Sequence, residues 1–123
     1  MSNLYTYHSR NGIGIFEILS EKLNIFNTSE VINTFRSIIE KNNPTAVIVD
    51  LKNVTHIDSV GIGFLVAIKS ITSKKGCSIH LISNNEVVIK VLKITKMDSF
   101  FTIFPAMEDA MRHLEADSSG MKE

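Results

Sequence analysis

The spacing of hydrophobic and polar positions changes several times along the chain, and each change predicts a different element. Residues 46–49 are apolar without alternation, which is typical of a strand covered on both faces in a parallel sheet. Residues 4–8 and 13–19 indicate two short strands joined at Asn11-Gly12, a dipeptide suited to a tight hairpin turn. Apolar residues at helical spacing predict four helices beginning near residues 29, 59, 86 and 105, and two more strands are expected at 78–82 and 100–104.

The order of these elements predicts the class of fold. Strands and helices alternate after the initial hairpin, which favours an α/β fold with a mainly parallel central sheet, an antiparallel edge hairpin and about four helices. A chain of 123 residues fits a single domain, which we expect to span residues 1–116. The last residues, 117–123, are polar and are predicted to form a disordered tail.

Charge and apolar content narrow the classes of partner. Lys plus Arg and Asp plus Glu both total 13, so no net field favours nucleic acid or an anionic membrane. The apolar stretch 60–68 is far shorter than the ~20 residues of a spanning helix, and residues 1–10 have no signal-peptide core, so we expect a cytoplasmic protein without membrane insertion. Cys77 is the only cysteine, which excludes an internal disulfide and indicates a small packing residue.

The residues that commonly hold metals or nucleotides do not form a recognisable pattern. The four histidines are spread along the chain without ligand spacing, so no metal is expected. Gly61 and Gly63 form G-x-G but lack the third glycine of a dinucleotide site, and backbone clearance explains them better. No cofactor is predicted.

The turn Asp58-Ser59-Val60-Gly61 is the most informative stretch, because it links the buried strand to the second helix. In parallel sheets, reactive and binding groups gather at the carboxyl ends of the strands, where this turn is expected. Ser59 stands where an N-cap residue would stand, so one interpretation is purely structural. A second is a phosphate acceptor, since a helix N-terminus tolerates the added charge of roughly −1.5 to −2.

A third interpretation makes Ser59 the nucleophile of a small hydrolase. Activation of the hydroxyl requires a base, and His56 and Asp58 are only sequence neighbours whose side chains need not converge on it. The segment also departs from G-x-S-x-G. The hydrolase is therefore the weakest of the three interpretations.

The second helix carries apolar residues on nearly every side. Ile62 and Phe64 lie outside a single apolar stripe, so the helix must hide more than one face. A partner surface is the natural second cover. The same apolar face, or an exposed strand edge, could also serve a homodimer.

The strand 47–51, the motif Asp58-Ser59-Val60-Gly61-Ile62-Gly63 and the later alternating elements through Leu114 resemble a known family. The chain looks like a STAS-domain anti-sigma factor antagonist of the bacterial partner-switching type. The resemblance implies that Ser59 is phosphorylated by a partner that is both anti-sigma factor and serine kinase. It implies that the unphosphorylated protein binds this kinase and releases a sigma factor, that phosphorylation reverses this, and that a PP2C-type phosphatase resets it. It also implies a switch without a catalytic group of its own.

The chain departs from the family at one position that bears on the partner. The family often has an aspartate at the end of the second strand, where this chain has Asn24, followed by the expected Asn27-Thr28-Ser29. Asn24 keeps a polar group and loses the charge, and Val60 leaves Ser59 as the only acceptor in the turn. The expected partner surface comprises Asn24, Thr28, Asp58, Gly61, Ile62, Gly63 and Phe64. Within the family, the alternative is an unphosphorylated STAS module that relays signals in a scaffold or a transport complex.

Overall fold

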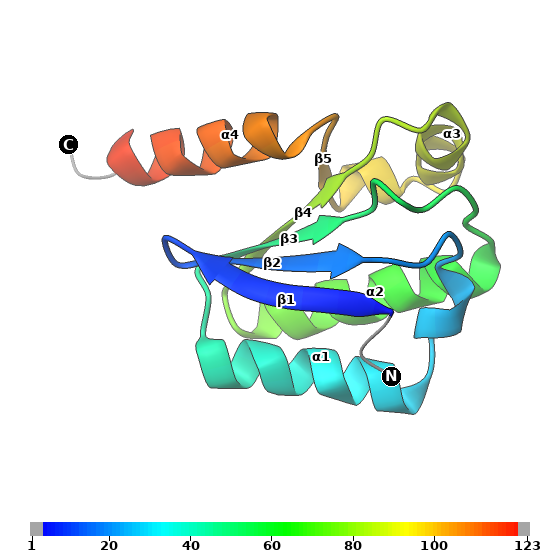
Figure 1. The fold of residues 1–123 in the computed structure, drawn as a ribbon, viewed down its shortest axis with the longest axis horizontal. Helices are drawn as coiled ribbons and strands as arrows, with labels where there is room; N and C mark the ends of the chain where they lie inside the picture. The colour runs from blue at the N-terminus through cyan, green and yellow to red at the C-terminus, as the bar shows by residue number, and fades with distance from the viewer. Residues whose placement is uncertain (1–3, 121–123) are drawn as a thin grey trace.

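The computed structural model describes residues 4–120 and contains one five-stranded sheet in the order β1-β2-β3-β4-β5 (Figure 1). β1 runs antiparallel to β2, and every other neighbouring pair is parallel. This mixed sheet confirms the predicted α/β fold with an antiparallel edge hairpin. The strands span Tyr5–Arg10 (β1), Ile13–Ile18 (β2), Ala46–Asp50 (β3), Ser78–Ile82 (β4) and Thr102–Phe104 (β5).

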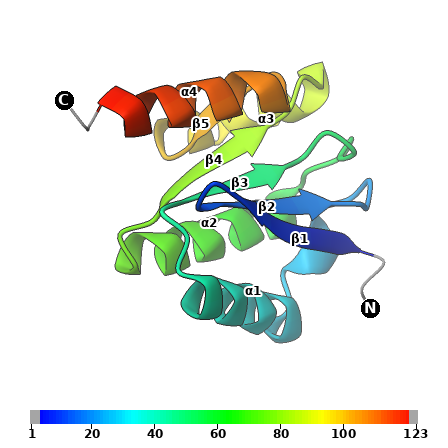
Figure 2. The same ribbon diagram turned by 60° about the vertical axis from the view of Figure 1, so that its left-hand side comes forward.

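The helices lie on both faces of the sheet. α1 and α2 run along one face and α4 crosses the other, as the two ribbon views show (Figures 1 and 2). Two short 3-10 helices, η1 and η2, lie within the connections. The bounds are Asn24–Phe26 (η1), Ser29–Asn42 (α1), Ser59–Lys74 (α2), Glu86–Ile94 (α3), Met97–Ser99 (η2) and Met107–Gly120 (α4).

The hairpin between β1 and β2 forms as its turn sequence predicts. Asn11 and Gly12 have φ values of 55° and 80°, and Arg10 pairs directly with Ile13. Two consecutive positive φ values define a type I′ turn, whose twist matches that of the flanking strands. The turn therefore sets the register of the edge hairpin.

The uninterrupted apolar run in β3 is explained by cores on both faces of the sheet. Val47 and Val49 belong to the larger core beneath α1, α2 and α3, whereas Ala46 and Ile48 belong to a smaller core beneath α4. All four side chains are buried. A strand covered on both sides has no solvent face and so shows no alternation.

The boundaries of β5 and α4 are among those that differ from the prediction. β5 begins at Thr102 rather than at residue 100, because the amides of Phe100 and Phe101 donate to the Met97 carbonyl and close a turn there. α4 continues through residues 117–120, which the sequence placed in the tail, and residues 121–123 lie outside the described part of the chain.

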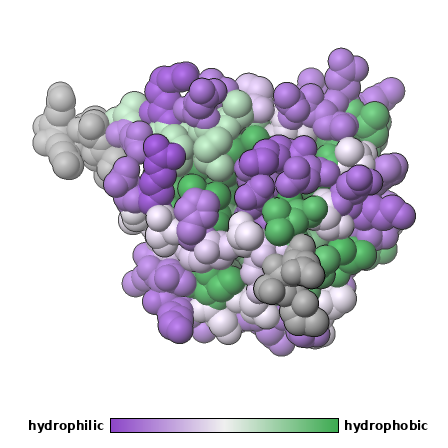
Figure 3. All heavy atoms as spheres, in the orientation of Figure 1, coloured by the Kyte–Doolittle hydropathy of each residue, from purple (hydrophilic) through white to green (hydrophobic). Residues whose placement is uncertain are grey.

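The surface on the β1 side mixes polar and apolar residues. Figure 3 shows apolar areas on this face interrupted by polar side chains. Among residues 4–120, no helix is both long enough and apolar enough to cross a membrane.

Candidate functional site

The segments that follow β2 and β3 are joined through their main chains. The amides of Thr55 and His56 donate to the Glu21 carbonyl at 2.9 and 3.2 Å, and the Leu23 amide donates to the His56 carbonyl at 3.4 Å. Lys22 and His56 form an isolated parallel bridge at the same place. These bonds bring residues 21–24 and residues 55–58 together at the carboxyl ends of their strands.

Asp58 is the N-cap of α2. Its Oδ1 accepts hydrogen bonds from the amides of Val60 and Gly61, both at 3.1 Å, and its carbonyl accepts from the amide of Ile62. The N-cap interpretation of Ser59 was therefore wrong by one residue. Either side chain can cap a helix, and the extended backbone of Asp58, with φ −116° and ψ −171°, places the cap at that residue.

Ser59 is the first residue of α2, and its side chain is exposed. Within residues 4–120, its hydroxyl is not hydrogen-bonded to His56 or Asp58. His56 Nδ1 instead lies 2.8 Å from Thr55 Oγ1, and the Asp58 carboxylate is occupied as the cap. The hydroxyl is accessible to another molecule, and the geometry gives no support to a triad built on these neighbours.

Asn24 lies against Asp58, although 34 residues separate them in the chain. Asn24 Nδ2 donates to Asp58 Oδ2 at 3.3 Å, so the two carboxylate oxygens of Asp58 have different partners. The Asn24 Oδ1 atom is buried and has no hydrogen-bond partner within the described residues. An amide suits this position because it can donate to the carboxylate, which a second ionised carboxylate could not do.

Gly61 and Gly63 let η1 approach the first turn of α2. A Cβ atom on Gly61 would lie 3.1 Å from the Cβ of Leu23, and one on Gly63 would lie 2.8 Å from Nδ2 of Asn27. The close approach that the G-x-G spacing predicts is thus made by the protein's own η1 segment. Gly61 is buried, so its expected role in partner contact is corrected to one of internal packing.

The remaining residues of the expected partner surface differ in exposure. Thr28 is exposed and caps α1 through its hydroxyl, which accepts from the Val31 amide at 3.2 Å, while Ile62 is half-buried against the larger core. Phe64 is fully buried, with its ring centroid 5.5 Å from that of Phe26. The expectation that Phe64 contacts a partner is therefore corrected, because its ring is part of the core.

A hollow of about 300 Å³ adjoins Asn24 and Asp58. It is also lined by Lys22, His56 and Val87, which were not among the predicted site residues. Val87 is 60 % exposed in the first turn of α3, and its position after β4 is the signal that would have placed it near this edge of the sheet. The hollow combines the Lys22 ammonium, the His56 imidazole, the Asp58 carboxylate and an apolar wall.

The family model for the STAS domain matches residues 6–110. The chain therefore belongs to the STAS domain family.

Solved structures share this fold. A candidate anti-sigma factor antagonist from Thermotoga maritima is 26 % identical, with a TM-score of 0.69 and coverage of 90 % of this chain and 94 % of that one. The anti-sigma factor antagonist SpoIIAA in its unphosphorylated form is 13 % identical, with a TM-score of 0.67 and coverage of 91 % and 96 %. The murine anion transporter Slc26a9 is 21 % identical, with a TM-score of 0.66, and the match covers 89 % of this chain but only 18 % of the transporter.

Proposed function

We propose that this protein is an anti-sigma factor antagonist controlled by phosphorylation of Ser59. In the unmodified state it binds an anti-sigma factor that is also a serine kinase, and this binding releases a sigma factor in the cytoplasm. The kinase transfers the γ-phosphoryl group of ATP to Ser59 Oγ, which loses its proton, and ADP leaves. A PP2C-type phosphatase hydrolyses the phosphoserine and restores the binding form. The protein is the substrate in both reactions and contributes no catalytic group.

The observation that carries this proposal is the position of Ser59. Its side chain is exposed at the first residue of α2, beside the capping carboxylate of Asp58 and next to the segment that contains Asn24. The likeness to anti-sigma factor antagonists, one of them 26 % identical, supports the same conclusion.

The hydrogen bonds around Asp58 suggest how the phosphate acts. The amides of Val60 and Gly61 already donate to the Asp58 carboxylate and that of Ile62 to the Asp58 carbonyl, so a phosphoryl group on Ser59 cannot take them without breaking the cap or the first helical hydrogen bond. The phosphate would instead project from the surface and add roughly −1.5 to −2 charge beside a carboxylate. A partner that fits the unmodified turn is then repelled, while the fold of the antagonist is retained.

The first test is recovery of the tagged protein from its native cells. We expect a co-purifying ATP-binding kinase and a fraction of protein in which mass spectrometry locates phosphate on Ser59. Ser59→Ala should abolish this phosphate, whereas Ser73→Ala, at an exposed serine near the end of the same helix, should leave it unchanged. Phosphate only on another residue would contradict the assignment of Ser59.

The second test isolates charge from shape. Binding of the recovered kinase is compared by calorimetry for the parent, Ser59→Asp and its neutral counterpart Ser59→Asn. We expect Ser59→Asp to weaken binding by at least about tenfold, equivalent to ~1.4 kcal/mol, and Ser59→Asn to bind much more tightly than Ser59→Asp. Equal affinities for the two variants would show that the partner does not sense charge.

These tests also distinguish the proposed antagonist from the alternative function within the family. A STAS module in a scaffold or a transport complex would co-purify with such a complex and would carry no phosphate on Ser59. The likeness to Slc26a9 concerns the fold alone, so it does not favour transport over partner switching.

A further inference from the structure

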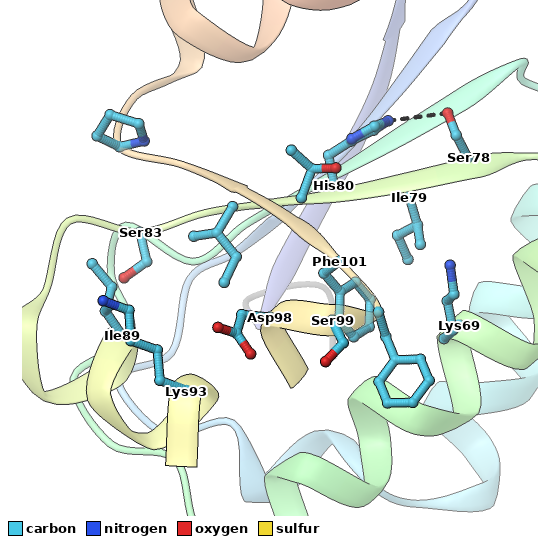
Figure 4. A pocket seen from close by; sticks show the side chains of 14 residues that line it. Lys69, Ser78, Ile79, His80, Ser83, Ile89, Lys93, Asp98, Ser99 and Phe101 are labelled. Atoms are coloured by element: carbon cyan, nitrogen blue, oxygen red, sulfur yellow. Dashed lines mark hydrogen bonds between the residues drawn. The ribbon is translucent and has the colours of Figure 1, made fainter. Parts of the chain in front are cut away.

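A groove runs along the β5 edge of the sheet and shares no lining residue with the candidate site. Its larger hollow has a volume of about 700 Å³ and lies among α2, β4, α3, η2 and β5. Figure 4 shows Lys69 on the α2 side and Lys93 on the α3 side, with Asp98 and Ser99 drawn between them. A volume of this size is within the usual range for a binding site.

A second hollow continues the groove onto the outer surface of α2. It has a volume of about 230 Å³ and a mainly apolar lining that includes Val66, Met97 and Phe100. Lys69, Phe100 and Phe101 line both hollows, so the two adjoin each other around these side chains. Val66 is 51 % exposed and Phe100 is 54 % exposed, so an apolar group seated between them would remove apolar surface from water.

The charge of the groove indicates the kind of group that binds there. The Lys69 ammonium lies 6.0 Å from the centroid of the Phe101 ring, and it has no carboxylate partner within residues 4–120. Lys93 adds a second positive charge, whereas Asp98 is the single acidic residue of the lining. A carboxylate that enters the groove can therefore pair with the half-buried Lys69 ammonium, which lies beside the apolar lining of the second hollow.

The sheet edge in the groove favours an extended occupant. β5 is the last strand of the sheet, so only one side of its main chain pairs with β4. β4 begins at Ser78, two residues before its pairing with β5 starts at His80, and both Ser78 and Ile79 line the larger hollow. An unpaired strand edge can accept main-chain hydrogen bonds from an added strand.

We propose that this groove binds an extended acidic segment of a partner protein. One apolar side chain of the segment lies between Val66 and Phe100, a neighbouring carboxylate pairs with Lys69, and the main chain follows β5. Val66 lies seven residues from Ser59, about 10 Å along the helix at 1.5 Å per residue. The groove is therefore a second docking surface, which a phosphate on Ser59 leaves open.

The experiment uses a phage-displayed library of random twelve-residue peptides, panned against the full-length protein. We expect enriched sequences that combine an apolar residue with two or more acidic residues. Chemical shifts of the isotope-labelled protein should then change at Val66, Lys69, Phe100 and Thr102 on addition of an enriched peptide. Ser59→Asp should bind the same peptide with unchanged affinity, which separates this result from the fate of the Ser59 switch.

Substitutions at positions outside the core keep the test independent of folding, since Lys69 is half-buried and Phe100 and Lys74 are exposed. Lys69→Glu and Phe100→Ser should each weaken the enriched peptide at least tenfold, whereas Lys74→Glu, on the same helix outside both hollows, should change affinity less than twofold. The proposal is overturned if enriched peptides are basic or uncharged, if their shifts map elsewhere, or if nothing is enriched over the Lys69→Glu protein. Shifts at the groove that depend on protein concentration alone would assign it to a second copy of the chain and would also overturn the proposal.

Discussion

Asp58 forms two kinds of contact with its two carboxylate oxygens. Oδ1 caps α2, and Oδ2 accepts the hydrogen bond from Asn24. Asp58→Ala removes both and should lower the free energy of unfolding by ~1–2 kcal/mol, as measured by urea denaturation.

The matched control at this position is Asp58→Asn. Asparagine is as good an N-cap as aspartate, but its Nδ2 would face the Asn24 Nδ2 donor, so this variant keeps the cap, loses the bond to Asn24 and should lower the free energy of unfolding by less than Asp58→Ala does. If Asp58→Ala were as stable as the parent, the cap would contribute nothing to the stability of the protein. Both variants remove the charge beside Ser59, but only Asp58→Ala also removes the cap.

The sequence located this turn but did not identify its capping residue. Asp58 and Ser59 are adjacent, and both residue types favour the N-cap position. The N-cap is the one of these two residues whose backbone is not helical. Contacts between residues 55–58 and residues 21–24, which are distant in sequence, decide which residue that is. Val87 beside the site was not predicted, although its position after β4 is a signal that places it near this edge of the sheet.

Among the elements, the contact between η1 and α2 depends on two glycines with different neighbours. The neighbour of Gly63 is the amide end of the exposed Asn27 side chain, which can swing away. The neighbours of Gly61 are the buried Cβ of Leu23 and the main-chain nitrogen of Asn24, and these atoms cannot move aside in the same way. The same substitution should therefore have opposite effects at the two positions.

Gly63→Ala should raise the free energy of unfolding by up to ~1 kcal/mol, because alanine is the better helix former. Gly61→Ala should lower it by about 1 kcal/mol or more, because the added methyl group overpacks η1. Thermal and urea unfolding of the parent and the two variants measure whether each substitution raises or lowers the free energy of unfolding. A stabilised Gly61→Ala would mean that η1 can move away from α2 at little cost.

Sequence patterns predicted the long elements better than the short ones. The uninterrupted run of β3 and the turn at Asn11-Gly12 are local signals, and both predictions are confirmed. η1 has only three residues, too few to show a period, and it was not predicted. β5 was predicted two residues too long because Phe100 and Phe101 suit a strand, but their amides are bound by Met97.

At the scale of the whole molecule, the larger core shields the single thiol. Cys77 is buried at the start of β4, and burial raises the pKa of its thiol from an ordinary value near 9 to about 11. At pH 8 the folded protein should therefore contain about 100-fold less thiolate than the unfolded chain. Reaction with Ellman's reagent should be slow in buffer and fast in guanidinium chloride, and equal rates would contradict the burial of Cys77.

The same pKa shift links stability to pH in a defined direction. The folded state keeps its thiol proton up to a higher pH than the unfolded state does, so stability is unaffected below about pH 9 and falls as the pH rises from there toward 11. Cys77→Ala should abolish this part of the decline. Urea denaturation of both proteins at pH 8 and pH 10 measures the difference, and parallel losses in the two proteins would assign the decline to other groups.

The main-chain bonds between residues 21–24 and residues 55–58 have a consequence for anyone who wishes to move this site into another scaffold. Neither loop holds its shape alone, because each supplies hydrogen-bond partners to the other. A graft of the Asp58-Ser59 turn by itself would carry the acceptor without the surface that frames it. The smallest transferable unit is the pair of loops together with the two neighbouring parallel strands from which they emerge.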